Sequence, residues 1–190
     1  MNALLKISFR VVAILSILTM MIALACGLAG LRVNTTRSIP IGVYLTHATP
    51  ITVGEYVIFC PPQNALFAVA KKRGYISVGF CDGGTGQMMK RVVAMAGDDV
   101  AITLDGVYVN DQRLPLSRPL SNDANHRPLP NLSGLRLRLA QDDVFLMSDV
   151  SATSFDGRYF GPINRSLIHH VIAPLIVVGG AVPIGTFASR

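Results

Sequence analysis

The sequence of 190 residues contains no tryptophan, only three cysteines and few charged side chains, at 15% of the total. It has no P-loop and no His-Glu-x-x-His motif, and its glycine-rich segment 81–87 lacks the strand and helix that flank a dinucleotide-binding loop. The adjacent His169 and His170 would point to opposite faces of a strand, which does not suit a single metal ion. The sequence therefore predicts no cofactor and no metal site.

Clustered basic residues are also scarce. The formal net charge is +6, from 17 Lys and Arg against 11 Asp and Glu, but only residues 71–73 form a basic cluster. A nucleic-acid-binding protein normally combines a basic stripe with aromatic side chains. We therefore expect no nucleic-acid partner and interpret the cluster as a solvated loop. The positive balance favours an acidic partner or an anionic membrane surface.

One long apolar segment is present, from Val11 to Leu31, without a charged residue. As a helix it would be roughly 31 Å long, close to the hydrocarbon thickness of a bilayer at about 30 Å. Lys6 and Arg10 precede it, so the positive-inside rule predicts a cytoplasmic N-terminus and an exported remainder. A cleaved signal peptide ending near Ala25 is the alternative, and the length of the segment favours a retained anchor.

These features divide the chain into a cytoplasmic N-terminus (1–10), a transmembrane anchor (11–31), an extracytoplasmic domain (32–175) and a C-terminal tail (176–190). In the exported part, short runs of strand formers alternate with turn residues, and no stretch has a sustained helical period. Asp105-Gly106, between two such runs, predicts a two-residue hairpin turn, and the proline-rich stretch 117–134 predicts a long surface loop. The expected fold is mostly β, an antiparallel sheet or barrel-like domain.

Two cysteines, Cys60 and Cys81, lie outside the anchor segment that contains Cys26. Their spacing matches no zinc signature. In an exported domain two such cysteines commonly pair, and the loop between them is easy to close. The sequence therefore suggests a Cys60–Cys81 disulfide, with two unpaired buried thiols as the alternative.

Lys90 interrupts an apolar run, "QMMKRVVAMAGDD". On a strand it would share a face with Met88 and Val92, and a lysine that faces an apolar layer has a lowered pKa because burial disfavours its charged form. A pKa near 7–8 would make the amine a general base, which arginine cannot become. The alternative is that Lys90 extends to solvent beside Arg91.

Three motifs occur in order after the anchor: "SIPIGVY" from Ser38, "MKRVVAMAGD" from Met89 and "SFDGRYFGPI" from Ser154. Together they resemble the type I signal peptidase (leader peptidase) superfamily. The Ser-x-Pro-x-Gly-x-Tyr pattern is similar to its conjugative-transfer branch, the TraF-type peptidases that mature pilin subunits. The resemblance runs from about residue 34 to residue 175 and is weak through the proline-rich stretch.

The resemblance implies a catalytic dyad in which Ser38 is the nucleophile and Lys90 the general base. The backbone N–H of Ser38 would be one oxyanion donor, and Thr36 occupies the position of a second hydroxyl donor. Pro40 and Gly42 would fix the local backbone so that the serine hydroxyl is presented.

The third motif supplies supporting residues by the same resemblance. Ser154 matches a serine that orients the lysine amine, and Asp156 and Arg158 match an aspartate and an arginine two places later. On a strand these three side chains would share one face, where Asp156 and Arg158 could pair. Without the resemblance, Asp156 would be interpreted as an ordinary turn aspartate.

The implied protein is a serine endopeptidase in the bacterial inner membrane, with its catalytic domain on the periplasmic side. Its partners would be the membrane lipid and a membrane-bound precursor, for which a conjugative pilin is the expected substrate; some relatives also close the pilin into a ring. The start of the third block, Ser148-Asp149-Val150, departs from the Gly-Asp-Asn of housekeeping enzymes. Two alternatives stay open: a non-catalytic scaffold for pilus assembly, and a housekeeping signal peptidase.

Overall fold

The structure, a computed structural model, describes residues 3–178 of the chain. Most of the expected tail, 179–190, lies outside the described residues.

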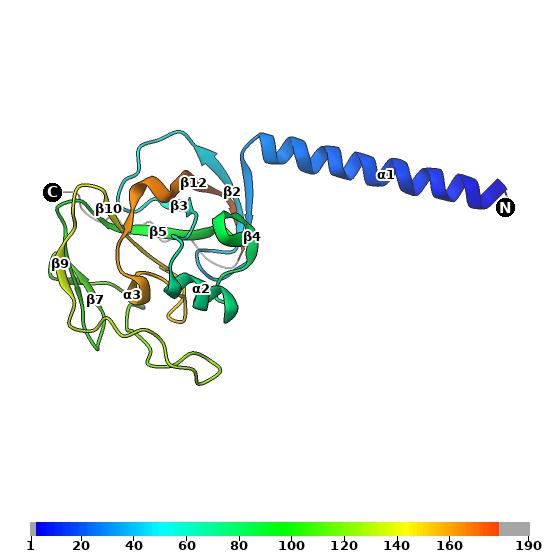
Figure 1. The fold of residues 1–190 in the computed structure, drawn as a ribbon. Coiled ribbons are helices and arrows are strands. Elements are labelled where there is room, and N and C mark those ends of the chain that lie inside the picture. Colours follow the sequence, from blue (N-terminus) through cyan, green and yellow to red (C-terminus); the bar gives the residue numbers. More distant parts are fainter. Residues whose placement is uncertain (1–2, 179–190) are drawn as a thin grey trace.

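A long N-terminal helix, α1, projects from a domain built mainly of strands (Figure 1). The helices are α1 (Ala3–Leu28), α2 (Ala65–Lys72) and α3 (Gly157–Phe160), with 3-10 turns at Asp82–Gly84 and Arg165–Leu167. The strands are β1 (Leu31–Asn34), β2 (Gly42–His47), β3 (Tyr56–Phe59), β4 (Val78–Cys81), β5 (Met88–Met95), β6 (Asp99–Ile102), β7 (Val107–Val109), β8 (Gln112–Arg113), β9 (Arg136–Arg138), β10 (Asp143–Met147), β11 (Ile163–Asn164) and β12 (Ile168–Val177).

Helix α1 contains the apolar segment expected to form an anchor. Ser8–Leu28 is long and apolar enough to cross a membrane, and no part of it is buried against the domain. The helix ends at Leu28 rather than Leu31, because Gly30 has a φ of +84° and Leu31 already pairs with Leu45 of β2. Only a short turn therefore separates the helix from the first sheet.

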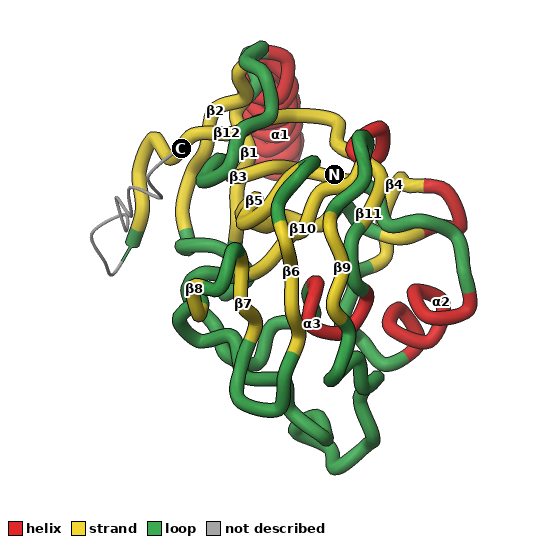
Figure 2. The backbone as a smooth tube through the Cα atoms, turned by 90° about the vertical axis from the view of Figure 1, so that its left-hand side faces the viewer, coloured by secondary structure: helices red, strands yellow, loops and turns green. Residues whose placement is uncertain are grey.

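The domain contains two antiparallel sheets; in Figure 2 the strands of the larger sheet are above those of the smaller one. The larger has seven strands in the order β1-β2-β12-β3-β5-β10-β11, and the smaller has four in the order β8-β7-β6-β9. The prediction of a mostly β, antiparallel fold is confirmed. The C-terminal strand β12 lies inside the large sheet, between β2 and β3.

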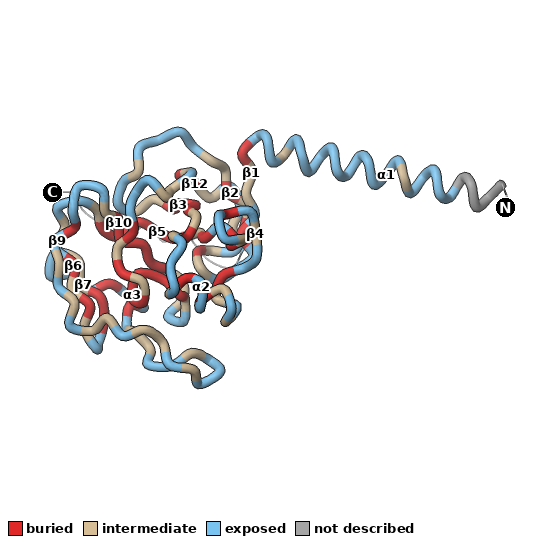
Figure 3. The backbone as a smooth tube through the Cα atoms, viewed as in Figure 1, coloured by how far each residue is buried: buried red, intermediate tan, exposed pale blue. Residues whose placement is uncertain are grey.

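Strand β5 is buried on both faces and separates two parts of the core (Figure 3). Met88 and Val92 pack into a cluster that includes Phe67 of α2, while Val93 packs with Phe145 against the small sheet. The alternation expected from the sequence is therefore present, and Lys90 lies on the Met88 and Val92 face.

Helix α2 was not predicted, and the basic cluster at 71–73 ends this helix rather than lying in a loop. Asn64 caps the helix by accepting a hydrogen bond from Phe67 N at 3.1 Å. Phe67 and Ala70 are its buried residues. Eight residues between prolines and glycines are too few to produce a visible helical period.

The expected hairpin joins β6 to β7, but the turn lies one residue earlier than predicted. Ile102 pairs with Val107, and Thr103 N donates to Gly106 O at 2.8 Å, so Leu104 and Asp105 form the turn. The Thr103 hydroxyl also donates to the Asp105 carboxylate and to Gly106 O, which favours this register over an Asp-Gly turn.

Two further features of the domain match the sequence analysis. Cys60 and Cys81 form a disulfide, with their Cα atoms 5.6 Å apart. The proline-rich stretch is a long loop between β8 and β9, tied to the domain by Leu120 N, which donates to the Tyr159 hydroxyl at 3.0 Å.

Candidate active site

An open cleft of about 530 Å³ lies between the β1–β2 turn and the start of β5. Its walls come from four separate parts of the chain: residues 33–38, residues 74–77, residues 87–90, and a segment with Ser151, Thr153, Ser154 and Phe155. Four of the six catalytic or supporting residues named from the sequence, Thr36, Ser38, Lys90 and Ser154, line this one cleft. No group of acidic, histidine or cysteine side chains suited to a metal ion occurs among the described residues 3–178.

Ser38 lies in the turn that joins β1 to β2. Ile39, the next residue, is fully buried in a cluster with Tyr44 and Ile172. The Tyr44 hydroxyl donates to Pro40 O at 2.5 Å, and burial, with the nearby Asp149 carboxylate, raises the pKa of Tyr44 to about 12. The residues after Ser38 are thus fixed in the core, and its half-buried hydroxyl is left at the cleft surface.

Asn34 organises the same turn, and the sequence analysis gave it no role. It is 4% exposed, and its amide nitrogen donates to Thr36 O, Ile39 O and Pro40 O at 2.7–3.1 Å. Its carbonyl oxygen accepts from Thr36 N at 3.2 Å and from the Thr36 hydroxyl at 2.9 Å. An Asn that bonds to the backbone two residues ahead forms an Asx turn, so Asn34-Thr35-Thr36 was the available signal.

Gly42 permits a close approach of strands rather than an unusual backbone angle. A Cβ atom at this position would lie 2.1 Å from Ile176 O and 2.8 Å from Val177 Cα of β12. Gly42, the glycine of the first motif, therefore allows the β1–β2 hairpin, which carries Ser38, to pack directly against β12.

The Ser38 hydroxyl is hydrogen-bonded to the Thr36 hydroxyl, with 2.8 Å between the oxygens, and either can donate. Because Thr36 also donates to Asn34, the geometry favours Ser38 as the donor to Thr36.

Lys90 is buried, at 3% exposure, so the alternative in which it extends to solvent is wrong. Its Nζ donates to the Ser154 hydroxyl at 3.0 Å. Burial lowers the pKa of the Lys90 amine to about 8; the Asp156 carboxylate raises it and the Arg158 guanidinium lowers it by smaller amounts. At pH 7 about a tenth of the amine is therefore neutral and able to accept a proton, and this share rises toward one half at pH 8.

Asp156 and Arg158 form an ion pair whose two side chains are both fully buried, with Arg158 Nε 2.8 Å from Asp156 Oδ1. The strand expected here is wrong: Asp156 is the N-cap of α3 and accepts from Arg158 N, because a capping carboxylate satisfies the free N–H groups of a helix start. The pair predicted from the third motif is nevertheless present.

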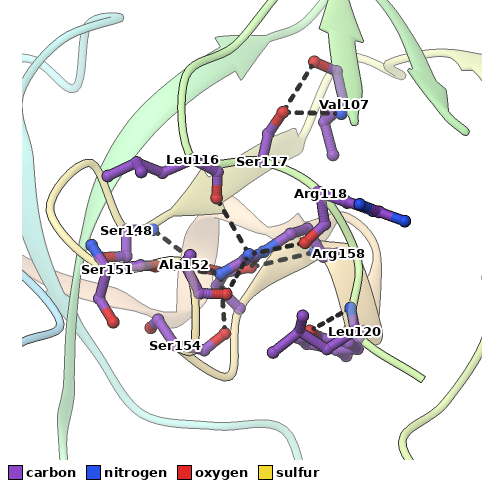
Figure 4. A network of polar contacts seen from close by, with 12 residues as sticks. Val107, Leu116, Ser117, Arg118, Leu120, Ser148, Ser151, Ala152, Ser154 and Arg158 are labelled. Carbon is purple, nitrogen blue, oxygen red and sulfur yellow. Dashed lines mark hydrogen bonds and ion pairs between the residues drawn. The ribbon is translucent and has the colours of Figure 1, made fainter. Parts of the chain in front are cut away.

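Arg158 also binds the backbone around the cleft (Figure 4). Its guanidinium donates to the carbonyl oxygens of Leu116, Arg118, Ser151, Ala152 and Ser154, at 2.7–3.3 Å. Asp156 in turn accepts from Ser148 N at 3.1 Å. These bonds hold the Ser154 segment and the start of the proline-rich loop, so Arg158 is a positioning residue.

A second buried network lies behind Lys90, and the sequence analysis did not anticipate it. Arg91 Nη1 donates to Asp149 Oδ2 at 3.2 Å, and the Tyr56 hydroxyl donates to the same oxygen at 2.6 Å. Burial and this hydrogen bond raise the pKa of Tyr56, which keeps the hydroxyl a donor. The Ser148 hydroxyl donates to Arg37 O at 3.4 Å, so one residue that departs from the housekeeping pattern contacts the residue before Ser38.

Comparison with known proteins places this geometry in a family. A family model described as signal peptidase, peptidase S26, matches residues 2–175. The chain belongs to this family. The match covers the cleft, both buried networks and helix α1, so the serine, the lysine and their supports lie within a peptidase domain.

Relatives of this S26 family member come from conjugation systems. It is 53% identical over 176 residues to a plasmid transfer protein TraF of Escherichia coli, covering 93% of this chain and 99% of the relative. It is 35% identical over 149 residues to a conjugal transfer protein TraF of Agrobacterium tumefaciens, covering 77% and 82%. A signal peptidase I structure from Enterococcus faecalis aligns with 66% of this chain and 98% of its own, at 18% identity and a TM-score of 0.38.

Proposed function

We propose that this chain is a membrane-anchored serine endopeptidase in which Ser38 and Lys90 remove the leader peptide of an exported protein. The observation that carries the proposal is a buried amine of lowered pKa in the same cleft as a serine hydroxyl. The likeness to TraF proteins of plasmid and conjugal transfer supports a conjugative pilin precursor as the substrate.

In the proposed reaction the neutral Lys90 amine takes the proton of Ser38 as its Oγ attacks the scissile carbonyl. The proton then passes to the departing amine, which leaves an acyl-enzyme on Ser38. A water molecule, or an amine when the product is cyclised, releases the acyl group. The backbone N–H of Ser38 would stabilise the oxyanion, and the Thr36 hydroxyl would join it once its proton turns from Asn34 Oδ1 to the substrate.

The hydrogen bonds within the cleft suggest how the dyad assembles. Among the described residues, the Ser38 hydroxyl bonds to Thr36 and the Lys90 amine bonds to Ser154. Substrate binding would exchange the Thr36 contact for Lys90, since catalytic hydrogen bonds often form only in the substrate complex. Ser154 would keep the amine aimed into the cleft.

The position of the cleft suits a substrate that emerges from a membrane. Ser38 follows the end of α1, Leu28, by a segment that spans at most roughly 35 Å when extended. Because Lys6 and Arg10 favour a cytoplasmic N-terminus, we place the domain on the periplasmic side of the bacterial inner membrane.

A serine-directed acylating probe tests the dyad and separates it from the non-catalytic scaffold. We expect the wild type to be labelled at Ser38 and both Ser38→Ala and Lys90→Ala to stay unlabelled, because the hydroxyl needs its base. Equal labelling of Ser38→Ala would contradict the assignment of the nucleophile. Accumulation of many uncut precursors in a deletion strain, instead of a pilin alone, would favour the housekeeping alternative.

The pH dependence of cleavage reports on Lys90. Because only the neutral amine is a base and its pKa is about 8, we expect the acylation rate to rise tenfold for each pH unit well below pH 8 and to level off above it. The measurement is the single-turnover cleavage rate between about pH 6 and pH 10. A flat profile over this range would argue against a lysine base.

A further inference from the structure

A second cavity adjoins the active-site cleft beside the proline-rich loop, which lies below α2 and α3 in Figure 1. It has a volume of about 520 Å³, and its walls come from residues 73–75, residues within 120–129 and the segment around Phe155. Four residues line both this cavity and the cleft: Gly74, Tyr75, Thr153 and Phe155. We call the second cavity the loop cavity; it meets the cleft at these shared residues.

The lining of the loop cavity is largely aromatic and aliphatic. Phe155 and Tyr159, which are 8% and 2% exposed, stack with their ring centroids 5.9 Å apart. The ring of Tyr75 packs against Phe155 at 5.3 Å between centroids, and Leu120 and Leu129 line the loop side. Such a lining favours a large apolar side chain, which gains free energy by leaving water.

Hydrogen bonds hold the loop against the domain. The Asp123 carboxylate accepts from the Tyr75 hydroxyl and, at 2.6 Å, from Arg127 Nε, while Arg73 Nη1 donates to Pro128 O at 2.7 Å. Both oxygens of Asp123 accept hydrogen bonds from the domain itself, so this carboxylate belongs to the wall of the cavity. The loop cavity is therefore preformed, and its apolar lining is the part that faces a ligand.

The position of the general base indicates which part of a substrate passes the loop cavity. In the proposed reaction Lys90 takes the proton of Ser38 and passes it to the departing amine, so that nitrogen must lie on the Lys90 side of Ser38. Lys90 Nζ is bonded to Ser154, and the next residue, Phe155, is shared by the cleft and the loop cavity. The chain that follows the scissile bond therefore leads past Ser154 toward the loop cavity.

An amine that releases the acyl group must enter from the same side. Its attack on the acyl-enzyme is acylation in reverse, so its nitrogen occupies the position of the leaving nitrogen. A new amide bond forms and the ester bond to Ser38 breaks. The attacking amine gives a proton to Lys90, and Lys90 returns a proton to the Ser38 oxygen as it leaves.

We propose that the loop cavity binds the peptide segment on the amine side of the reacting bond, with a large apolar side chain against its aromatic lining. During cleavage this segment follows the scissile bond, and during ring closure it is the N-terminal segment whose amine attacks the acyl-enzyme. The inference rests on the proposed Ser38 and Lys90 peptidase. Its consequence is that the loop cavity sets the share of acyl groups that pass to an amine instead of water.

An acyl donor without a leaving peptide tests this site separately from the dyad. A peptidyl ester ending in alanine acylates Ser38 of the detergent-solubilised full chain, and peptide amides with a free N-terminus compete with water for the acyl group. The amides are tetraglycine amide and variants of it with phenylalanine at each position in turn. Ala124→Trp places an indole at the exposed rim of the loop cavity, and Ala140→Trp, exposed in the β9–β10 turn and lining neither cavity, is the matched control.

We expect the wild type and Ala140→Trp to prefer one of the phenylalanine amides over tetraglycine amide by about tenfold or more in the ratio of aminolysis to hydrolysis, since burial of an apolar side chain contributes that much. Ala124→Trp should lose this preference.

Ester hydrolysis in the same reactions reports on the dyad. If the wild type hydrolyses the ester but shows no preference among the amides, the proposed site is wrong while the dyad stands. A preference that persists in a hydrolysing Ala124→Trp also overturns the proposal. If the ester does not acylate Ser38 of the wild type, the proposed peptidase fails and the inference fails with it.

Discussion

Replacing Lys90 by methionine is expected to abolish precursor cleavage and, at the same time, to stabilise the folded domain. The amine is buried, and burial lowers its pKa from 10.5 to about 8. At about 1.4 kcal/mol for each pH unit, the charged form is disfavoured by about 3 kcal/mol in the folded protein. Methionine fills a similar volume without this cost, so a catalytic loss would coincide with a stability gain.

Thermal unfolding of the detergent-solubilised protein at pH 7 measures this effect, and Ser38→Ala is the matched control. That control should lose cleavage with little change in stability, because Ser38 is half-buried and uncharged. The folded pKa of Lys90 lies below the unfolded one, so between about pH 8 and 10.5 the unfolded chain binds more protons. Wild-type stability therefore rises through this window, and the advantage of Lys90→Met should disappear above it. A methionine variant less stable than Ser38→Ala at pH 7 would contradict the argument.

Replacing Asp156 by alanine is expected to cost about 3–5 kcal/mol of folding stability, because it leaves the buried Arg158 guanidinium without its counter-ion. The same change removes the N-cap of α3 and the acceptor for Ser148 N. Arg158 holds five backbone carbonyls around the cleft, so the loss should loosen the Ser154 segment as well.

The domain offers a matched pair for comparison. Arg138 and Asp99 lie 3.8 Å apart on the small sheet, with side chains 71% and 66% exposed. An exposed pair of this kind is worth about 0–1 kcal/mol, so Asp99→Ala should unfold nearly as the wild type does. Chemical denaturation of both variants measures the difference, and equal midpoints would show that burial of the Asp156 pair does not matter.

The sequence allowed the general organisation to be predicted because its strongest patterns are local. The apolar run of α1, the alternation around Lys90 and the β6–β7 hairpin depend on neighbouring residues, and each is present in the structure. The resemblance to signal peptidases added the grouping of Ser38, Lys90 and Ser154, which no local pattern contains. The structure places these three on one cleft.

The features missed depend on contacts between distant segments. Asp149 lies 58 positions from Arg91 and 93 from Tyr56, so no spacing in the sequence indicates that network. Asn34 is an exception: its contacts are local, and the Asx-turn signal in Asn34-Thr35-Thr36 was available but not used. The strand expected at Asp156 was wrong for a different reason. Asp156 caps α3, a helix of a single turn, and an alternating pattern of side chains gives no sign of such a short helix.

The position of β12 determines when the proposed enzyme can become active during its own production. Within the described residues the β1–β2 hairpin, which carries Ser38, pairs in the large sheet with β12 alone. β12 joins it to the β3–β5 half that carries Lys90. Because synthesis starts at the N-terminus, Ser38 and Lys90 are made long before residues 168–177. Until β12 is present, the two halves cannot join into one sheet. A partly translocated chain would therefore lack an assembled active site, and peptidase activity would begin only after β12 had crossed the membrane.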